Sequence, residues 1–167
     1  MIFITGGARS GKSRFALLEA QKFETSVTFL ATAQAFDTEM TERIARHKFE
    51  RQALGWQTKE VPLELTKALL ETNNTVLLDC LSLWVSNMLL ADKSEKTMLE
   101  ELALLLELQA TREHMLLVVS NEVGSGVVPE YALGRTYRDW LGRANQKVAA
   151  ASSHAYLLVA GLPLKLK

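Results

Sequence analysis

The residues of this sequence with the clearest chemical meaning are GGARSGKS, from Gly6 to Ser13. The stretch fits the pattern G-x-x-x-x-G-K-[ST] of a phosphate-binding loop. Its glycines let the backbone turn and approach a phosphate closely, and successive N–H groups face the anion. Lys12 is expected to reach the β- and γ-phosphates of a nucleoside triphosphate, and the hydroxyl of Ser13 to bind Mg²⁺.

The residues on either side of this loop supply the context that the motif requires. The apolar run MIFIT before it predicts a buried strand, because it is short and rich in β-branched residues. The stretch KSRFALLEAQKF after it predicts a helix, whose positive end would face the phosphate. A strand, a glycine loop and a helix in this order favour a phosphate-binding loop over an ordinary glycine-rich turn.

A second candidate for phosphate chemistry is Asp79, which ends the apolar run TVLLD. An acid at the end of a central strand can hold Mg²⁺ directly or through water, as in a Walker B motif. The alternative is that Asp79 caps the helix predicted from LSLWVSNMLL. The phosphate-binding loop in the same chain favours the magnesium role.

The helix predicted over residues 37–51 carries a histidine in a basic stripe. Arg43, His47 and Arg51 are spaced i, i+4, i+8 and so share one helix face, with Arg46 and Lys48 beside them. These cations could hold a polyphosphate, and they disfavour the imidazolium, which leaves a neutral imidazole as a nucleophile. From the spacing alone, a solvated basic face with an incidental histidine is the more common interpretation.

The remaining motifs are less specific. His114 and His154 show no metal-ligand spacing with His47 and are interpreted as structural. The loop NEVGSGVVPE, residues 121–130, could reach over a site or be an ordinary connection. Cys80 is interpreted as a small core residue.

Composition limits the class of protein. The chain has 48% hydrophobic residues, and Lys+Arg and Asp+Glu are equal at 19 each, which gives no overall charge for binding nucleic acid. Its one cysteine, the lack of a signal peptide and the lack of a long apolar run predict a cytoplasmic protein with no membrane span. Residues 1–167 are expected to form a single nucleotide-binding catalytic domain.

The elements that must position these residues alternate between strand and helix. Strands are predicted at residues 27–32, 56–61, 75–80, 114–120 and 155–160, with helices at residues 63–71, 81–90, 97–113 and 131–151 and a surface loop at 92–96. The leucines of the 97–113 helix surround most of its circumference, which predicts deep burial or a subunit contact. This alternation predicts an α/β fold like that of P-loop NTPases, with a mostly parallel central sheet and helices on both faces.

These stretches together resemble one family, the bifunctional adenosylcobinamide kinase / adenosylcobinamide-phosphate guanylyltransferases of cobalamin biosynthesis. The resemblance covers nearly the whole chain, and the segments RIARHK, NEVGSGVVPE and GRANQ in that order are its most specific part. It implies a kinase step that phosphorylates adenosylcobinamide with ATP or GTP. It also implies transfer of GMP from GTP to adenosylcobinamide phosphate through a GMP-histidine intermediate, which gives adenosyl-GDP-cobinamide.

The resemblance also implies roles for single residues. His47 in RIARHK corresponds to the guanylylated histidine, which overrides the incidental interpretation, and Lys12 shares the catalytic role. Mg²⁺ would be held by Ser13 and Asp79, and the family is typically cytoplasmic and homotrimeric. The chain departs from the family at Arg51-Gln52, where Arg-Pro is common. The implied nucleotide contacts are Gly6, Gly7, Ala8, Arg9, Ser10, Gly11, Lys12, Ser13, Gln34, Ala35, Phe36, Lys48, Phe49, Glu50, Arg51, Glu60 and Asp79.

Two other functions are compatible with the phosphate-binding loop. The first is a small-molecule kinase with no guanylyltransferase step, which would retain no label from alpha-labelled GTP. The second is a nucleotide-dependent switch whose loops order around the γ-phosphate. No obvious effector segment accompanies the predicted core, so the switch ranks last.

Overall fold

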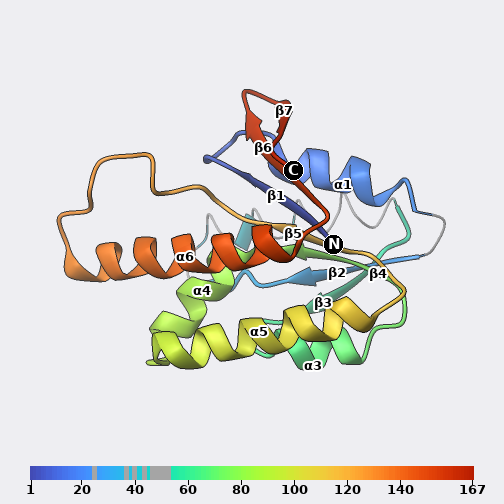
Figure 1. Cartoon of the computed structure of the whole chain (residues 1–167), viewed down its shortest axis with the longest axis horizontal. Coiled ribbons are helices and arrows are strands. Elements are labelled where there is room, and N and C mark those ends of the chain that lie inside the picture. Colours follow the sequence, from blue (N-terminus) through green and yellow to red (C-terminus); the bar gives the residue numbers. More distant parts are fainter. Residues whose placement is uncertain (24–25, 36–37, 39–40, 43–44, 46–53) are drawn as a thin grey trace.

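The computed structural model of the chain describes residues 1–23, 26–35, 38, 41–42, 45 and 54–167. Its centre is a seven-stranded sheet with the order β3-β2-β4-β5-β1-β6-β7 (Figure 1). All neighbouring strands are parallel except β6 and β7. The strands are β1 Ile2–Gly6, β2 Val27–Ala31, β3 Gln57–Glu60, β4 Thr75–Asp79, β5 Leu116–Val119, β6 His154–Val159 and β7 Leu162–Lys165.

Helices cover both faces of this sheet, as the sequence predicts. Helix α1 lies on one face, and α3, α4, α5 and α6 lie on the other (Figure 1). Each face has its own apolar cluster, one with side chains from α3 to α6 and one with side chains from α1. The described helices are α1 Lys12–Ala20, α3 Leu65–Leu70, α4 Leu81–Leu90, α5 Glu95–Thr111 and α6 Ala132–Ala151.

The central strands form where the sequence has short continuous apolar runs. Ile4, Leu77 and Leu117 come from three of these runs, and each is at most 1% exposed. Side chains on both faces of a parallel strand are covered by helices, so such a strand needs no polar alternation. Burying each of these side chains stabilises the fold by about 1.5–3 kcal/mol.

Helix α5 begins earlier than the sequence analysis predicts. Residues 95 and 96, predicted as part of a surface loop, form its first turn, because Ser94 caps the helix and accepts a hydrogen bond from Thr97 N at 3.1 Å. Leu102 and Leu105 are buried, whereas Leu104 is 52% exposed. Within this chain the helix therefore buries one face and not its whole circumference.

The last strand, β7, is missing from the sequence analysis. Its residues LPLK pair antiparallel with β6. The turn between the two strands places Ala160 at φ 50° and Gly161 at φ 82°, the left-handed geometry of a tight hairpin. The alternation of strand and helix in the rest of the chain gives no signal for this hairpin.

The helix predicted over residues 37–51 falls largely outside the described residues. The described residues in that range, 38, 41–42 and 45, are helical. In the part of the chain that the structure describes, no helix combines the length and apolar character needed to cross a membrane.

Candidate nucleotide site at the carboxyl edge of the sheet

The described candidate residues follow four parallel strands at one edge of the sheet. The phosphate-binding loop follows β1, and Gln34 and Ala35 follow β2. Glu60 ends β3, and Asp79 ends β4. This is the edge at which ligands of open α/β sheets bind. The fold therefore brings these separate segments of the sequence to the same edge.

The conformation of the loop explains its glycines. Gly6 has a φ of 157°, and a Cβ there would lie 2.6 Å from both Leu158 O and Ser10 Oγ. Gly11 has a φ of 93°, and a Cβ there would lie 3.1 Å from Gly161 Cα. Arg9 also has a positive φ, of 56°. Backbones with such residues turn successive N–H groups inward and form concave anion sites.

Lys12 and Ser13 occupy the first turn of α1, whose N-cap residue is Gly11. No side chain caps this helix end, so its N–H groups and positive dipole face the loop. Lys12 Nζ donates a hydrogen bond to Gly7 O at 2.9 Å, across the loop. The lysine is thus directed back over the loop, where a phosphate would lie.

Asp79 ends β4, and helix α4 begins two residues later with Cys80 as its N-cap residue. The N-cap position of α4 is therefore Cys80 and not Asp79. The peptide bond between Asp79 and Cys80 is cis. Burial, together with the negative charge of Asp79, raises the pKa of the Cys80 thiol to about 11. The thiol is therefore neutral near pH 7 and behaves as the predicted core residue.

Two buried polar residues that the sequence analysis does not single out join the strand ends. Thr32 Oγ1 donates to Cys80 O at 2.8 Å and accepts from Cys80 N at 2.9 Å. Asn87 Nδ2 donates to Thr32 O at 2.8 Å and to Pro62 O at 3.0 Å. These bonds tie the ends of β2, β3 and β4 together. They fix the backbone from which Asp79 and Gln34 project.

Glu60 lies at the far end of this edge, on the outermost strand β3. Strands in a sheet are about 4.8 Å apart. Strand β3 is four strand spacings from β1, or roughly 19 Å, whereas β4 is two spacings from β1, or roughly 10 Å. Glu60 borders a groove of about 1000 Å³ that also contacts Leu63, Thr66 and Leu104. The structure thus places Asp79 nearer to the phosphate-binding loop than it places Glu60.

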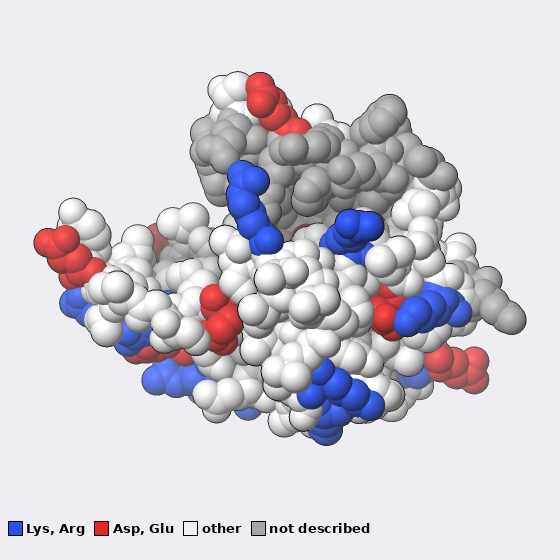
Figure 2. Space-filling model, turned by 90° about the horizontal axis from the view of Figure 1, so that it is seen from above, with Lys and Arg blue, Asp and Glu red and all other residues white. Residues whose placement is uncertain are grey.

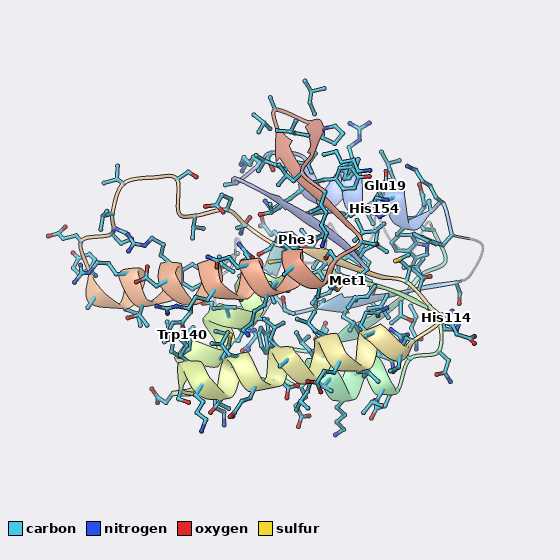
Figure 3. The ribbon with its side chains drawn as sticks, viewed as in Figure 1. Met1, Phe3, Glu19, His114, Trp140 and His154 are labelled. Carbon is cyan, nitrogen blue, oxygen red and sulfur yellow. The ribbon has the colours of Figure 1, made fainter. Side chains whose placement is uncertain are left out.

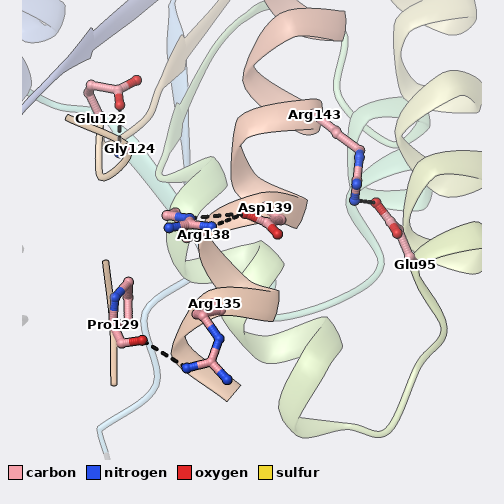
Figure 4. A network of polar contacts seen from close by, with 8 residues as sticks. All are labelled: Glu95, Glu122, Gly124, Pro129, Arg135, Arg138, Asp139 and Arg143. Carbon is pink, nitrogen blue, oxygen red and sulfur yellow. Dashed lines mark hydrogen bonds and ion pairs between the residues drawn. The ribbon is translucent and has the colours of Figure 1, made fainter. Parts of the chain in front are cut away.

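The loop after β5, which the sequence analysis left open, is anchored at both ends. Glu122 N donates to Gly6 O at 3.0 Å, beside the phosphate-binding loop. Its carboxylate accepts a hydrogen bond from Gly124 N at 2.6 Å, so it folds back into its own loop (Figure 4). At the other end, Arg135 Nη1 donates to Pro129 O at 3.0 Å.

Two candidate residues discounted by the sequence analysis lie away from this edge. His114 precedes β5 and His154 begins β6, so both lie at the amino ends of parallel strands (Figure 3). Among the described residues, no group of three or more His, Cys, Asp or Glu side chains could hold a metal ion. The face in Figure 2 mixes both charge signs among its described residues, as equal numbers of acidic and basic residues predict.

Several predicted site residues lie outside the described part of the chain, and the structure does not test their roles. They are Phe36, His47, Lys48, Phe49, Glu50 and Arg51, together with Arg43 and Arg46 of the basic stripe.

A mostly parallel sheet whose first strand leads through this glycine loop into a helix defines an α/β protein of the P-loop NTPase type. The family described as cobinamide kinase / cobinamide phosphate guanyltransferase matches residues 2–166. The chain belongs to this family.

Curated relatives agree with this assignment over nearly their whole length. The chain is 44% identical to the bifunctional adenosylcobalamin biosynthesis protein CobP of Pseudomonas aeruginosa, over 98% of this chain and 95% of the relative. It is 37% identical to the bifunctional adenosylcobalamin biosynthesis protein CobU of Salmonella typhimurium and 39% identical to that of Escherichia coli. Each of these two matches covers 100% of this chain and 99% of the relative.

Proposed function

We propose that this chain phosphorylates adenosylcobinamide with ATP or GTP and then transfers GMP from GTP to adenosylcobinamide phosphate. The product of the second reaction is adenosyl-GDP-cobinamide. The observation that carries the proposal is a family match over residues 2–166 in a chain whose glycine loop and Asp79 lie at one sheet edge. The names of the family and of its relatives describe both activities and the biosynthesis of adenosylcobalamin.

In the kinase step, the loop from Gly6 to Ser13 holds the triphosphate. Phosphoryl transfer depends mainly on positioning and on neutralising charge. The N–H groups of the loop and of the start of α1 supply donors, and Lys12 supplies a positive charge. The hydroxyl of Ser13 and the carboxylate of Asp79 are hard oxygen ligands that suit Mg²⁺, which neutralises phosphate charge when bound. Magnesium commonly uses only one or two carboxylates together with substrate phosphates, so this small donor set fits it.

In the guanylyltransferase step, His47 is the nucleophile. Its ring nitrogen bonds to the α-phosphorus of GTP, the bond from that phosphorus to the α–β bridging oxygen breaks, and pyrophosphate leaves. A phosphate oxygen of adenosylcobinamide phosphate then displaces the histidine. The positive charges of Arg43 and Arg51 support this role, because they favour a neutral imidazole and can hold the triphosphate.

Other parts of the proposal concern contacts and assembly. We expect Gln34, Ala35, Phe36, Glu60 and the segment 48–51 to contact the guanine nucleotide. We also expect one catalytic domain over residues 1–167 in a cytoplasmic homotrimer. Side chains that are apolar and exposed in the single chain support a contact between subunits, among them Val127 at 95%, Tyr131 at 77% and Leu162 at 72% exposure.

The test compares His47→Ala with wild-type protein and with His154→Ala, a control that replaces an exposed histidine at the opposite edge of the sheet. Alpha-labelled GTP should label the wild-type protein and the control but not His47→Ala. Phosphate transfer from gamma-labelled ATP to adenosylcobinamide should persist in all three proteins. The label on the protein should be lost in acid and kept in base, as expected of a phosphoramidate.

Three outcomes would contradict parts of this scheme. Undiminished alpha label on His47→Ala would remove His47 as the nucleophile. Loss of both activities in a folded His47→Ala protein would show that His47 organises the shared nucleotide site. Kinase activity in the wild-type protein without any label would favour the small-molecule kinase.

A further inference from the structure

Two family-specific segments that have no role in the scheme above meet at the carboxyl edge of the sheet. They are NEVGSGVVPE after β5 and GRANQ on α6. Ser120 Oγ donates to Asn145 Oδ1 at 2.6 Å, and Asn145 Nδ2 donates to Asn121 O at 3.0 Å. Asn145 therefore fixes the backbone from which Asn121 projects.

The side chain of Asn121 is oriented by the start of α4. Asn121 Nδ2 donates to Ser82 Oγ at 3.1 Å. Ser82 is 0% exposed, its Oγ lies 3.0 Å from Cys80 Sγ, and its carbonyl accepts from Tyr137 OH at 3.3 Å. Ser82, Ser120, Asn121 and Asn145 are called the Asn121 clamp below. Because Nδ2 of Asn121 donates to Ser82, the Oδ1 atom of Asn121 is the side-chain atom that can accept a hydrogen bond from a ligand.

The clamp lies between the two parts of the site that handle phosphate. Strand β5 has β1 on one side and β4 on the other. Ser120 N donates to Ile4 O at 2.9 Å and Glu122 N to Gly6 O at 3.0 Å, so Asn121 stands level with the start of the phosphate-binding loop. On the other side Val119 is in register with Asp79. Each neighbouring strand is about 5 Å away.

We propose that Asn121 Oδ1 accepts a hydrogen bond from the alcohol that is phosphorylated in the kinase step. The inference rests on the proposed function and assigns a substrate-positioning residue to it. The alcohol oxygen bonds to the γ-phosphorus, the bond to the β–γ bridging oxygen breaks, the nucleoside diphosphate leaves, and the hydroxyl proton goes to solvent. Asn121 takes no proton and only directs the oxygen toward the phosphorus.

A neutral amide suits this position better than a carboxylate. Asp79 and the γ-phosphate already bring negative charge to the neighbouring strand ends, and another carboxylate there would repel both. Glu122 carries the adjacent carboxylate, but that group is engaged with Gly124 N at 2.6 Å (Figure 4). Asn121 can thus accept from a hydroxyl without adding charge.

The same chemistry separates the two acceptors. The alcohol of the kinase step has an O–H group to donate, whereas the phosphate of the second acceptor offers mainly oxygen lone pairs. The carbonyl oxygen Oδ1 of Asn121 can accept a hydrogen bond from the alcohol, but it gains no hydrogen bond from the lone pairs of the phosphate. Neither acceptor takes part in forming the GMP adduct, so Asn121 serves phosphorylation and is not needed for that adduct.

The test uses the full chain and the variants Asn121→Ala and Asn145→Ala. The control is Gln146→Ala, which removes an exposed amide next to Asn145 on the same helix. Two rates are measured: phosphate transfer from gamma-labelled ATP at varied adenosylcobinamide concentration, and labelling of the protein by alpha-labelled GTP. Thermal unfolding is followed in parallel.

We expect Asn121→Ala to lower kcat/KM for adenosylcobinamide about ten- to hundredfold, at most the loss that misplacing a reacting group can cause. Labelling by GTP should stay within about twofold of wild type. Asn145→Ala acts through Asn121, so it should lower kcat/KM in the same direction with a smaller change. Gln146→Ala should match wild type in both assays.

Equal loss of phosphate transfer and GTP labelling in Asn121→Ala would overturn the proposal, because the clamp would then serve the nucleotide or the fold. Unchanged kcat/KM in a folded Asn121→Ala protein would also overturn it. Wild-type protein that phosphorylates adenosylcobinamide but takes no label would refute the guanylyltransferase scheme while the kinase comparison still decides the role of Asn121. Wild-type protein with neither activity would refute the proposed function and this inference with it.

Discussion

Replacing Thr32 with valine tests whether buried hydrogen bonds hold Asp79 in place. Thr32 is 0% exposed, and its hydroxyl makes two bonds to the peptide groups of Cys80, the residue after Asp79. Valine keeps the shape of threonine but removes the hydroxyl. The change therefore isolates these hydrogen bonds from packing.

The expected cost follows from what the substitution leaves unpaired. Cys80 N loses the acceptor that Thr32 provides, and a buried N–H without a partner costs about 1–3 kcal/mol. Cys80 O keeps a donor, Trp84 N at 3.2 Å, so its loss is smaller, about 0.5–1 kcal/mol. Thr32→Val should therefore lower the free energy of unfolding by about 1.5–4 kcal/mol. Thr32→Ser keeps the hydroxyl and loses one methyl group, which costs about 1 kcal/mol.

Urea unfolding of wild type, Thr32→Val and Thr32→Ser measures these differences, with the slope m checked for constancy. Kinase kcat is then measured well below each midpoint. We expect both stability and kcat to fall in the order wild type, Thr32→Ser, Thr32→Val, because Thr32 holds the peptide group that joins Asp79 to Cys80. A valine variant as stable as the serine variant would show that the two hydrogen bonds do not fix this strand end, and the reasoning would fail.

Three other predictions concern the same edge of the sheet. Lys12→Ala should slow both half-reactions about a hundredfold or more, since one loop serves both, and near-normal turnover of either would place the phosphate site elsewhere. Asp79→Asn keeps the shape and removes the charge, so activity should fall and the Mg²⁺ concentration for half-activity should rise; an unchanged magnesium dependence would contradict the metal role. The pKa of the Cys80 thiol is raised to about 11, so the stability that the neutral thiol contributes is present below the ordinary thiol pKa of 9.0 and is lost as pH rises toward 11. Iodoacetamide should therefore alkylate Cys80 at pH 8 only after the protein unfolds.

The sequence predicts the parts of the fold that depend on local patterns. The runs ending at Gly6 and Asp79 are continuous and apolar, and they form the central strands β1 and β4. The boundary of α5 is wrong by two residues, because a serine cap depends on the backbone geometry at one position, Ser94. Strand β7 is missed because LPLK is exposed along its length and its pairing comes from the β6–β7 turn.

The candidate site likewise has one part that the sequence predicts from a local motif and another part that depends on contacts between distant segments. A fixed motif marks Gly6 to Ser13, and the structure gives that loop the positive φ angles that glycine allows. Thr32 and Asn87 carry no motif that marks a role, and Asn121 and Asn145 lie in family-specific segments to which the sequence analysis gives no role. Each of the four acts through a partner far away in the sequence. Only the fold reveals these pairs. The role of His47 rests on sequence and resemblance, because it lies outside the described residues.

The packing of the phosphate-binding loop limits how one site can serve two reactions. Phosphorylation needs the γ-phosphorus in front of the acceptor, and the proposed guanylyl transfer needs the α-phosphorus in front of the proposed nucleophile His47. The loop is held by Gly161 N, which donates to Ser10 O at 2.9 Å, and by the contacts that leave no room for a Cβ at Gly6. Both contacts hold the loop against strand β6 and the β6–β7 turn, so we expect the loop to keep its place in both reactions. The change between the two proposed reactions is then expected to come from the nucleotide or from the segment that carries His47.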